Sequence, residues 1–182
     1  MNLPNRLCVL RLLLAPIVAV LILLNETVWA AGLFAACAIT DAIDGYLARR
    51  WKQITLLGQM LDPIADKALI NLSFLAAAAS GYLPWWLALL VLGRDVLILT
   101  GAVFSWIFGL GHTLLPLAIG KISTFLQMGL ILATLLAAAK TPHAFAVPEA
   151  LITAVAIATL ASGILYAAIW LFHLFRRRQP VP

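Results

Sequence analysis

The chain has 182 residues, of which 64% are hydrophobic and only 10% are charged, and its formal net charge is +5. Soluble domains carry about a quarter of their residues as charged side chains, so this composition excludes a soluble globular domain. We expect one compact integral membrane domain over residues 1–182. The two cysteines, Cys8 and Cys37, lie in apolar stretches and indicate neither a disulfide nor a metal–thiolate site.

Six apolar stretches, taken in chain order, have the length of membrane-spanning helices. A helix needs about 20 mostly apolar residues to cross the hydrocarbon core of a bilayer. The predicted helices cover residues 6–24, 28–50, 57–79, 84–107, 113–139 and 148–176, and short polar or Gly- and Pro-containing breaks separate them. The expected fold is therefore an all-α integral membrane protein with six transmembrane helices.

The positive charges predict how these helices are oriented. Six crossings place both termini on the same side of the membrane. That side receives most of the Lys and Arg residues of the predicted turns and ends: Arg6, Arg49, Arg50, Lys52, Arg176, Arg177 and Arg178. The opposite turns contain only Lys140 among Lys and Arg residues. The bias predicts that both termini and residues 51–55 are cytoplasmic. These cations could also hold anionic lipid headgroups, and nothing in the pattern indicates a nucleic-acid partner.

Four aspartates lie within the segment "TDAIDGYLARRWKQITLLGQMLDPIADK", residues 40–67. Asp41 and Asp44 are three residues apart near the end of the second predicted helix, and Asp62 and Asp66 are four apart near the start of the third. Residues three or four apart share one face of a helix. Because the connection between the two helices is short, we expect antiparallel neighbours with both acid pairs at one depth, near the cytoplasmic surface.

Carboxylates gathered in a poorly solvated cleft are either partly protonated or separated by cations. Ligands that are all oxygen favour Mg²⁺, Mn²⁺ or Ca²⁺, and two divalent ions would neutralise four carboxylates. Paired metal ions recur in phosphoryl-type displacement reactions. Small residues at Gly45, Ala48 and Gly58 leave room for a ligand beside the acids, and Arg49 offers a cation to a phosphate. The alternative is a solvated loop with incidental acids, which the helical spacing disfavours.

At these residues the sequence resembles the CDP-alcohol phosphatidyltransferase family. The family signature D-x-x-D-G-x-x-A-R-x8-G-x-x-x-D-x-x-x-D is present without departure, and the six-helix pattern is similar as well. The resemblance implies that an acceptor hydroxyl attacks the lipid-side phosphorus of a CDP-linked lipid and that CMP leaves. It also implies a homodimer in the bilayer. For this chain we expect the bacterial inner membrane, with the active site near the cytoplasmic face.

The resemblance further implies roles for individual residues. Asp41, Asp44 and Asp62 would be ligands of two Mg²⁺ or Mn²⁺ ions, and Asp66 would join the metal site and act as general base. The residues implied in CDP binding are Asp41, Asp44, Gly45, Ala48, Arg49, Gly58 and Asp62. These roles agree with the chemistry of metal-stabilised phosphoryl transfer, in which a nearby base takes the proton of the attacking hydroxyl.

The acceptor is less determined by the resemblance. The opening "NLPNRLCVLRLLLAP", and Gly120-Lys121 followed by Thr124 and Gln127, resemble both phosphatidylglycerophosphate synthases and CMP-forming cardiolipin synthases. Arg94-Asp95 precedes an apolar run with no further cation before Lys121. A phosphomonoester needs several cations, so this pattern favours phosphatidylglycerol as acceptor and cardiolipin as product. The alternative acceptor is glycerol 3-phosphate, held by cations gathered from several helices: Arg11, Lys67, Arg94 and Lys121.

Two interpretations of the intramembrane charges remain open. Arg94 contacts a substrate phosphate, or it forms a structural ion pair with Asp95. An ion- or proton-coupled transporter would also place acids and arginines in a membrane, but transporters typically have repeated halves, which this sequence lacks. A non-catalytic membrane scaffold would not need four aspartates at these spacings.

Overall fold

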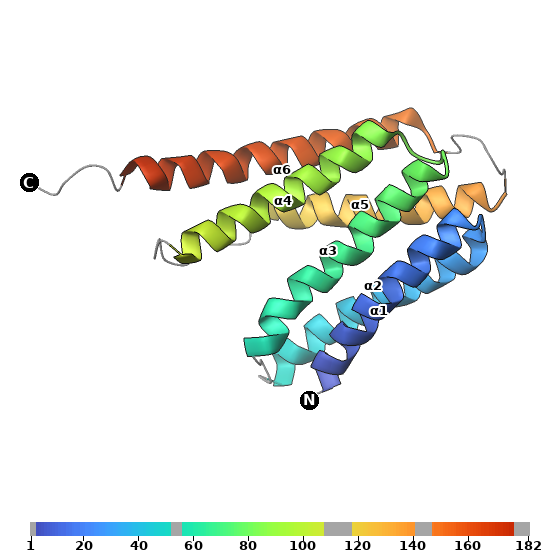
Figure 1. Cartoon of the computed structure of the whole chain (residues 1–182), viewed down its shortest axis with the longest axis horizontal. Helices are drawn as coiled ribbons and strands as arrows, with labels where there is room; N and C mark the ends of the chain where they lie inside the picture. The colour runs from blue at the N-terminus through green and yellow to red at the C-terminus, as the bar shows by residue number, and fades with distance from the viewer. Residues whose placement is uncertain (1–2, 52–55, 108–117, 141–146, 177–182) are drawn as a thin grey trace, which may run out of the picture.

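The computed structural model describes the backbone of residues 3–51, 56–107, 118–140 and 147–176, and the side chains of most of them, but not those of residues 41–66. Within this part of the chain the regular secondary structure is entirely helical (Figure 1). The helices are α1 (Leu3–Leu23), α2 (Thr27–Trp51), α3 (Leu56–Ala79), α4 (Trp85–Ile107), α5 (Ala118–Ala138) and α6 (Glu149–Arg176). The six predicted helices are confirmed, with ends that differ by a few residues. The predicted start of the fifth helix at residue 113 lies outside the described residues.

The turns after α1 and α3 are closed in the same way, and they contact each other. Asn25 and Gly81 adopt positive φ angles of 60° and 76°. In the second turn, the N–H of Tyr82 donates to the carbonyl of Ala77 at 2.8 Å, as in a Schellman motif. The hydroxyl of Tyr82 then donates to Oδ1 of Asn25 at 2.8 Å. This bond holds the α1–α2 and α3–α4 turns together at one end of the molecule.

Both helices that follow a proline begin immediately after it. The carbonyl of Pro84 accepts from the N–H of Leu87 at 3.1 Å, and the carbonyl of Pro148 accepts from the N–H of Leu151 at 2.9 Å. A proline at this position sacrifices no helical hydrogen bond, because its missing N–H would have no partner within the helix. The prolines therefore set the starts of α4 and α6.

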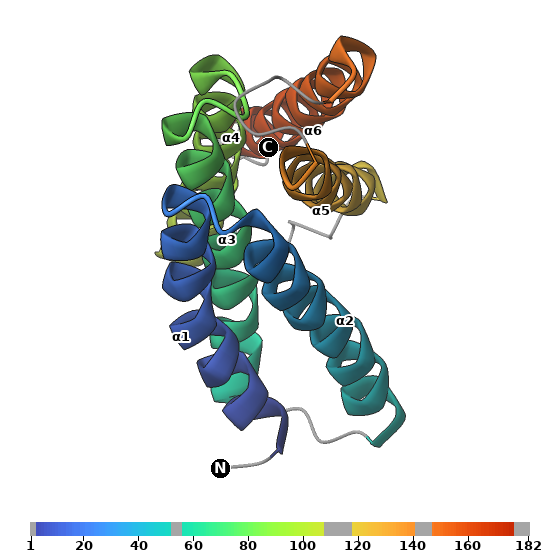
Figure 2. The same ribbon diagram turned by 90° about the vertical axis from the view of Figure 1, so that its right-hand side faces the viewer.

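Helix α3 is the central element of the arrangement. It packs against α1, α4 and α5, while α6 packs against α4 and α5, and α2 packs against α1 and α5. Figures 1 and 2 show α1, α2 and α3 grouped on one side of the molecule and α4, α5 and α6 on the other. Contacts between α3 and α4 therefore join the helix that carries Asp62 and Asp66 to the second group.

The buried interior contains both small and aromatic side chains. Ala76, Ala77 and Ala78 on α3 are buried, as are Phe34 on α2 and Phe74 on α3. Small residues let helix backbones approach closely, which is the main way in which helices attract one another inside a bilayer. The alanine-rich end of α3 is thus explained by packing within this chain.

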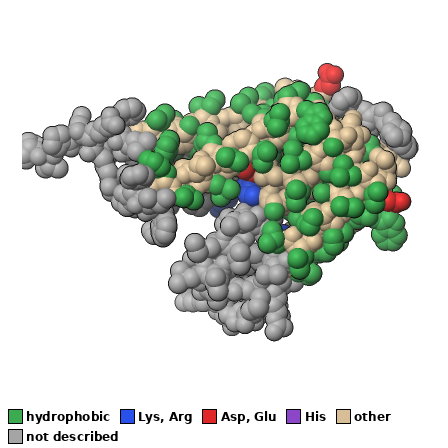
Figure 3. Space-filling model, viewed as in Figure 1, with side chains coloured by type: hydrophobic (Ala, Val, Ile, Leu, Met, Phe, Trp, Pro, Cys, Tyr) green, Lys and Arg blue, Asp and Glu red, His purple; other side chains and the backbone are tan. Residues whose placement is uncertain are grey.

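The outer surface of the described residues is strongly apolar. Figure 3 shows hydrophobic side chains spread over the described surface of one face, with few charged ones among them. Phe125, Ile164 and Leu24 are each at least 65% exposed. Two described stretches, Ile119–Ala138 and Glu149–Leu171, are long and apolar enough to cross a membrane, and Leu10–Leu23, Thr27–Thr40 and Lys67–Ala79 are shorter apolar segments. That all six helices cross the membrane stays a prediction.

Candidate active site

The four aspartates lie at the end of one helix and at the start of the next. Asp41 and Asp44 belong to the last three turns of α2, and Asp62 and Asp66 to the first three turns of α3. Only residues 52–55 separate the two helices. The side chains of residues 41–66, and with them the signature residues Gly45, Ala48, Arg49 and Gly58, lie outside those that the structure describes. Among the side chains that it does describe, no group of three metal-ligating residues comes together.

The donor set of the signature fits a hard divalent metal. Its four acidic positions offer only carboxylate oxygens, the ligands that Mg²⁺ and Mn²⁺ prefer. The helical assignment keeps Asp41 and Asp44 three residues apart within α2, and Asp62 and Asp66 four apart within α3, so each pair shares a helix face. The residues present are therefore compatible with a site for divalent ions.

The residue after Asp66 begins a buried ionic cluster. Nζ of Lys67 lies 2.7 Å from Oδ1 of Asp95 on α4, and the side chain of Asp95 is fully buried. One turn further along α3, Nδ2 of Asn71 donates to Oδ2 of Asp95 at 3.0 Å. Each carboxylate oxygen of Asp95 therefore accepts from α3, through two residues on the same face of that helix.

Arg94 connects the same carboxylate to α5 and α6. Its Nη1 donates to Oδ1 of Asp95 at 2.7 Å, and its Nε and Nη2 donate to Oγ of Ser162 at 3.2 and 2.8 Å. Nη2 also lies 3.4 Å from the carbonyl oxygen of Gly120. The ion pair between Arg94 and Asp95, one of the two interpretations left open by the sequence, is present. Contact between Arg94 and a substrate phosphate stays a prediction.

Gly120 provides the space that Arg94 occupies. A Cβ atom at this position would lie 3.2 Å from Nη2 of Arg94 and 3.2 Å from the hydroxyl oxygen of Tyr166 on α6. Both distances are shorter than ordinary van der Waals contacts. At Gly163 on α6, an added Cβ would lie 3.6 Å from Cγ of Arg94, which is an ordinary contact. The close approach of Arg94 and Tyr166 therefore explains why glycine, the first residue of the "GK" pair, suits position 120.

A second group of buried polar side chains lies between α5 and α6. Nε2 of Gln127 donates to Oγ1 of Thr159 at 3.0 Å and lies 3.4 Å from Oγ of Ser123. The hydroxyl of Thr124 donates to the carbonyl of Gly120 at 3.0 Å, within its own helix. Gln127 and Thr124, two residues of the family-like pattern, therefore have structural partners inside the bundle.

The four cations predicted for the acceptor lie in different environments. Lys67 and Arg94 are brought together by Asp95. Arg11 is buried in α1, and Lys121 is exposed on α5. Sequence reasoning missed Asn71 and Ser162 as partners of this cluster. The available signals were the spacing of four between Lys67 and Asn71, and a polar face of α6 formed by Thr159 and Ser162.

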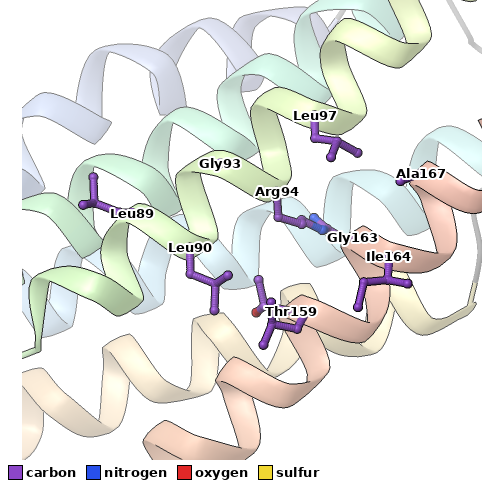
Figure 4. Close-up of a pocket in the computed structure, with 10 residues that line it drawn as sticks. Leu89, Leu90, Gly93, Arg94, Leu97, Thr159, Gly163, Ile164 and Ala167 are labelled. Atoms are coloured by element: carbon purple, nitrogen blue, oxygen red, sulfur yellow. The ribbon is translucent and has the colours of Figure 1, made fainter.

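A largely apolar groove of about 340 Å³ lies between α4 and α6, beside Arg94. In Figure 4 the Arg94 side chain extends from α4 toward Gly163, and Leu90 and Thr159 lie nearby. The lining residues are Leu89, Leu90, Gly93, Arg94, Leu97, Thr159, Leu160, Gly163, Ile164 and Ala167. Gly93 and Gly163 widen the groove because neither has a side chain to fill it.

Comparison with known proteins identifies the family. The sequence profile of the CDP-alcohol phosphatidyltransferase family matches residues 1–173. The chain belongs to the CDP-alcohol phosphatidyltransferase family. The match covers all six helices up to residue 173, so membership does not depend on the acidic signature alone.

Several curated proteins are similar over part of their length. A CDP-diacylglycerol–glycerol-3-phosphate 3-phosphatidyltransferase of Yersinia pestis is 36% identical over 71% of this chain and 74% of its own length. A protein of the same name from Cereibacter sphaeroides is 46% identical over 53% of this chain. A CMP-forming cardiolipin synthase of Rattus norvegicus is 38% identical over 57% of this chain. The chain spans 47% of the Cereibacter protein and 34% of the rat protein.

Proposed function

We propose that this protein transfers a phosphatidyl group from CDP-diacylglycerol to an acceptor hydroxyl and releases CMP. The observation that carries the proposal is the complete acidic signature, which spans the end of α2 and the start of α3, in a chain whose family profile extends over residues 1–173. The similar proteins support the donor, since two carry CDP-diacylglycerol in their names and the third is described as CMP-forming.

The acidic positions would hold the metal ions of this reaction. Two divalent ions would balance the charge of the four carboxylates of Asp41, Asp44, Asp62 and Asp66. Bound Mg²⁺ or Mn²⁺ would supply positive charge where the leaving phosphate and the attacking oxygen become more negative. The CDP moiety would be bound beside them by Gly45, Ala48, Arg49 and Gly58.

Asp66 is the proposed general base. In the reaction, the acceptor oxygen forms a bond to the lipid-side phosphorus while the bond from that phosphorus to the CMP oxygen breaks. The proton of the acceptor hydroxyl passes to the carboxylate of Asp66, and the bonding electrons leave with CMP. A positioned carboxylate is well suited to this step because it accepts the proton as the hydroxyl becomes a nucleophile.

Phosphatidylglycerol is the acceptor that we propose, with cardiolipin as the product. Lys67 and Arg94 share the carboxylate of Asp95, so two cations and one anion leave this cluster with a single net positive charge. One positive charge suits a phosphodiester better than a phosphomonoester dianion, which usually needs several Arg or Lys residues. The apolar groove between α4 and α6 is a surface of the kind that an acyl chain needs.

Glycerol 3-phosphate is the second candidate acceptor, and the relatives favour it. The Yersinia and Cereibacter proteins are both named for glycerol 3-phosphate, and the Yersinia match covers the larger share of both chains. Arg11 and Lys121 would then have to contribute to binding the phosphomonoester, in addition to Lys67 and Arg94.

The apolar surface and the charge distribution support a proposal for the membrane setting of the reaction. We propose that the six helices of this single domain cross a bacterial inner membrane, with both termini and the residue 51–55 connection on the cytoplasmic side. The bias of Lys and Arg toward that side supports the orientation. The proposed active site lies near the cytoplasmic face, and the proposed assembly is a homodimer.

A competition experiment tests the proposed function. Purified protein is given labelled CDP-diacylglycerol with glycerol 3-phosphate and phosphatidylglycerol at equal concentrations, and the lipid products are separated. We expect CMP and cardiolipin. If phosphatidylglycerophosphate predominates, the acceptor is glycerol 3-phosphate and not phosphatidylglycerol. If CMP is released but neither lipid forms, the protein catalyses the family reaction with a different acceptor. If no CMP is released, the proposed reaction is refuted.

A further inference from the structure

The carboxylate of Asp95 on α4 accepts hydrogen bonds from two successive turns of α3. Its Oδ1 accepts from Nζ of Lys67 at 2.7 Å, and its Oδ2 accepts from Nδ2 of Asn71 at 3.0 Å. Lys67 and Asn71 are four residues apart and so lie on one face of α3. Two bonds from one fixed carboxylate to successive turns of a helix restrict both its rotation and its sliding.

Asp95 is itself held in place from the other side. Oδ1 also accepts from Nη1 of Arg94 at 2.7 Å, and Arg94 donates to Ser162 on α6 through Nε and Nη2. The side chain of Asp95 is 0% exposed and that of Arg94 is 5% exposed. Because its partners come from α3, α4 and, through Arg94, α6, the carboxylate cannot turn without breaking several bonds.

The rotation of α3 matters because the same helix carries half of the acidic signature. Asp66 directly precedes Lys67, so the two positions are separated by about 100° around the helix. Asp62 lies about one turn earlier, on nearly the same face as Asp66. A rotation of about 20° would move a side-chain tip, about 5 Å from the helix axis, by about 2 Å. Metal–oxygen distances tolerate only about 0.2 Å.

We propose that Asp95 is a positioning residue for the metal site: by holding Lys67 and Asn71, it sets the rotation of α3 at which Asp62 and Asp66 meet the divalent ions. This inference rests on the proposed function, because it assigns Asp95 to the metal site of that reaction. Asp95 touches neither the metal nor the substrate in this proposal, and its effect passes through α3. Replacing a group that orients the ligands of a metal typically weakens metal binding by about 10- to 100-fold.

The test measures metal binding rather than turnover. The full chain in detergent micelles is titrated with Mn²⁺, and free Mn²⁺ is followed by electron paramagnetic resonance. We expect Asp95→Asn to raise the Kd for Mn²⁺ about tenfold or more. Asn71→Leu leaves both ion pairs of Asp95 in place but removes one of its two bonds to α3. We expect it to raise the Kd in the same direction and by less.

Gln127→Leu is the matched control, because it removes a buried hydrogen bond between α5 and α6 in which no residue of α3 takes part. We expect it to leave the Kd for Mn²⁺ unchanged even where it lowers the melting temperature. The proposal is overturned if Asp95→Asn and Asn71→Leu bind Mn²⁺ as the wild type does, or if Gln127→Leu weakens binding equally. If Asp95→Asn does not fold, the result for Asn71→Leu decides.

The same titration separates this proposal from the proposed function. If the wild-type chain binds Mn²⁺ and releases CMP, and Asp95→Asn and Asn71→Leu bind Mn²⁺ with the same affinity as the wild type, only the role of Asp95 is overturned. A wild-type chain that neither binds Mn²⁺ nor releases CMP overturns both.

Discussion

Arg94 on α4 donates two hydrogen bonds to the hydroxyl oxygen of Ser162 on α6, from Nε at 3.2 Å and from Nη2 at 2.8 Å. Both residues are buried, and they are 68 positions apart in the chain. Inside a bilayer, helices gain little from the hydrophobic effect, so close packing and interhelical hydrogen bonds hold them together. This pair is therefore a principal polar contact between α4 and α6.

Replacing Ser162 by Ala should destabilise the protein. The buried guanidinium of Arg94 would lose the acceptor of two of its N–H groups, and hydrogen bonds to charged groups contribute about 1–3 kcal/mol. Thermal unfolding in detergent would measure the loss. Thr153→Ala is the control, because that exposed hydroxyl bonds only to the carbonyl of Glu149 in its own helix. Equal melting temperatures for both variants would contradict the prediction.

Gly120 and Gly129 on α5 allow a comparison of one substitution in two settings. At Gly120 an added methyl group would lie 3.2 Å from Nη2 of Arg94 and from the Tyr166 hydroxyl, whereas nothing lies within 4 Å of one at Gly129. We expect Gly120→Ala to destabilise by about 1–3 kcal/mol, as overpacking usually does. Gly129→Ala should be neutral or stabilising by up to about 1 kcal/mol, because alanine favours helix. Unfolding midpoints in the reverse order would refute this explanation.

Activity should depend on a divalent metal. Because the signature gathers four carboxylates, we expect CMP release to stop on addition of a chelator and to return with excess Mg²⁺ or Mn²⁺. Asp41→Asn, Asp44→Asn and Asp62→Asn should each weaken Mn²⁺ binding, since an amide oxygen is a poorer ligand than a carboxylate for these ions. Undiminished turnover in the presence of chelator would rule out the metal mechanism.

Asp66→Asn should separate binding from turnover. The variant keeps the size of the side chain but cannot accept the proton of the attacking hydroxyl. We expect CDP-diacylglycerol still to bind while turnover falls by about 10²–10⁴, the usual contribution of a general base. Single-turnover release of CMP measures the chemical step, and CDP-lipid binding is measured alongside it. A variant with wild-type turnover would remove Asp66 from the role of base, and one that no longer binds CDP-lipid would identify it chiefly as a metal ligand.

Much of the fold is predictable from the sequence because membrane helices depend on local composition. Apolar stretches of about 20 residues, followed by Asn25 or Gly81 or preceded by a proline, predict helices whose described bounds agree with the structure within a few residues. The family assignment is similarly local, since the spacing from Asp41 to Asp66 fits within two helices and one connection. The family profile over residues 1–173 confirms that assignment.

The pairing of the buried charges could not be derived in the same way. The sequence leaves open whether Arg94 contacts a substrate phosphate or pairs with Asp95, and it places Lys67 only in a general group of cations. Tertiary structure brings Lys67 and Asn71 to the two oxygens of one carboxylate, because α3 and α4 pack at a particular rotation. Rotation depends on side chains from helices far apart in sequence, so no local pattern reveals it.

The sequence by itself thus determined the six helices and the acidic signature, because helical periodicity and apolar length are properties of contiguous residues. Only the tertiary structure decided that Asp95 joins α3 to α4, that Ser162 accepts hydrogen bonds from Arg94, and that a side chain at position 120 would crowd Arg94 and Tyr166. Each of these depends on atoms brought within about 3 Å by helix packing, where hydrogen-bond geometry and steric exclusion act.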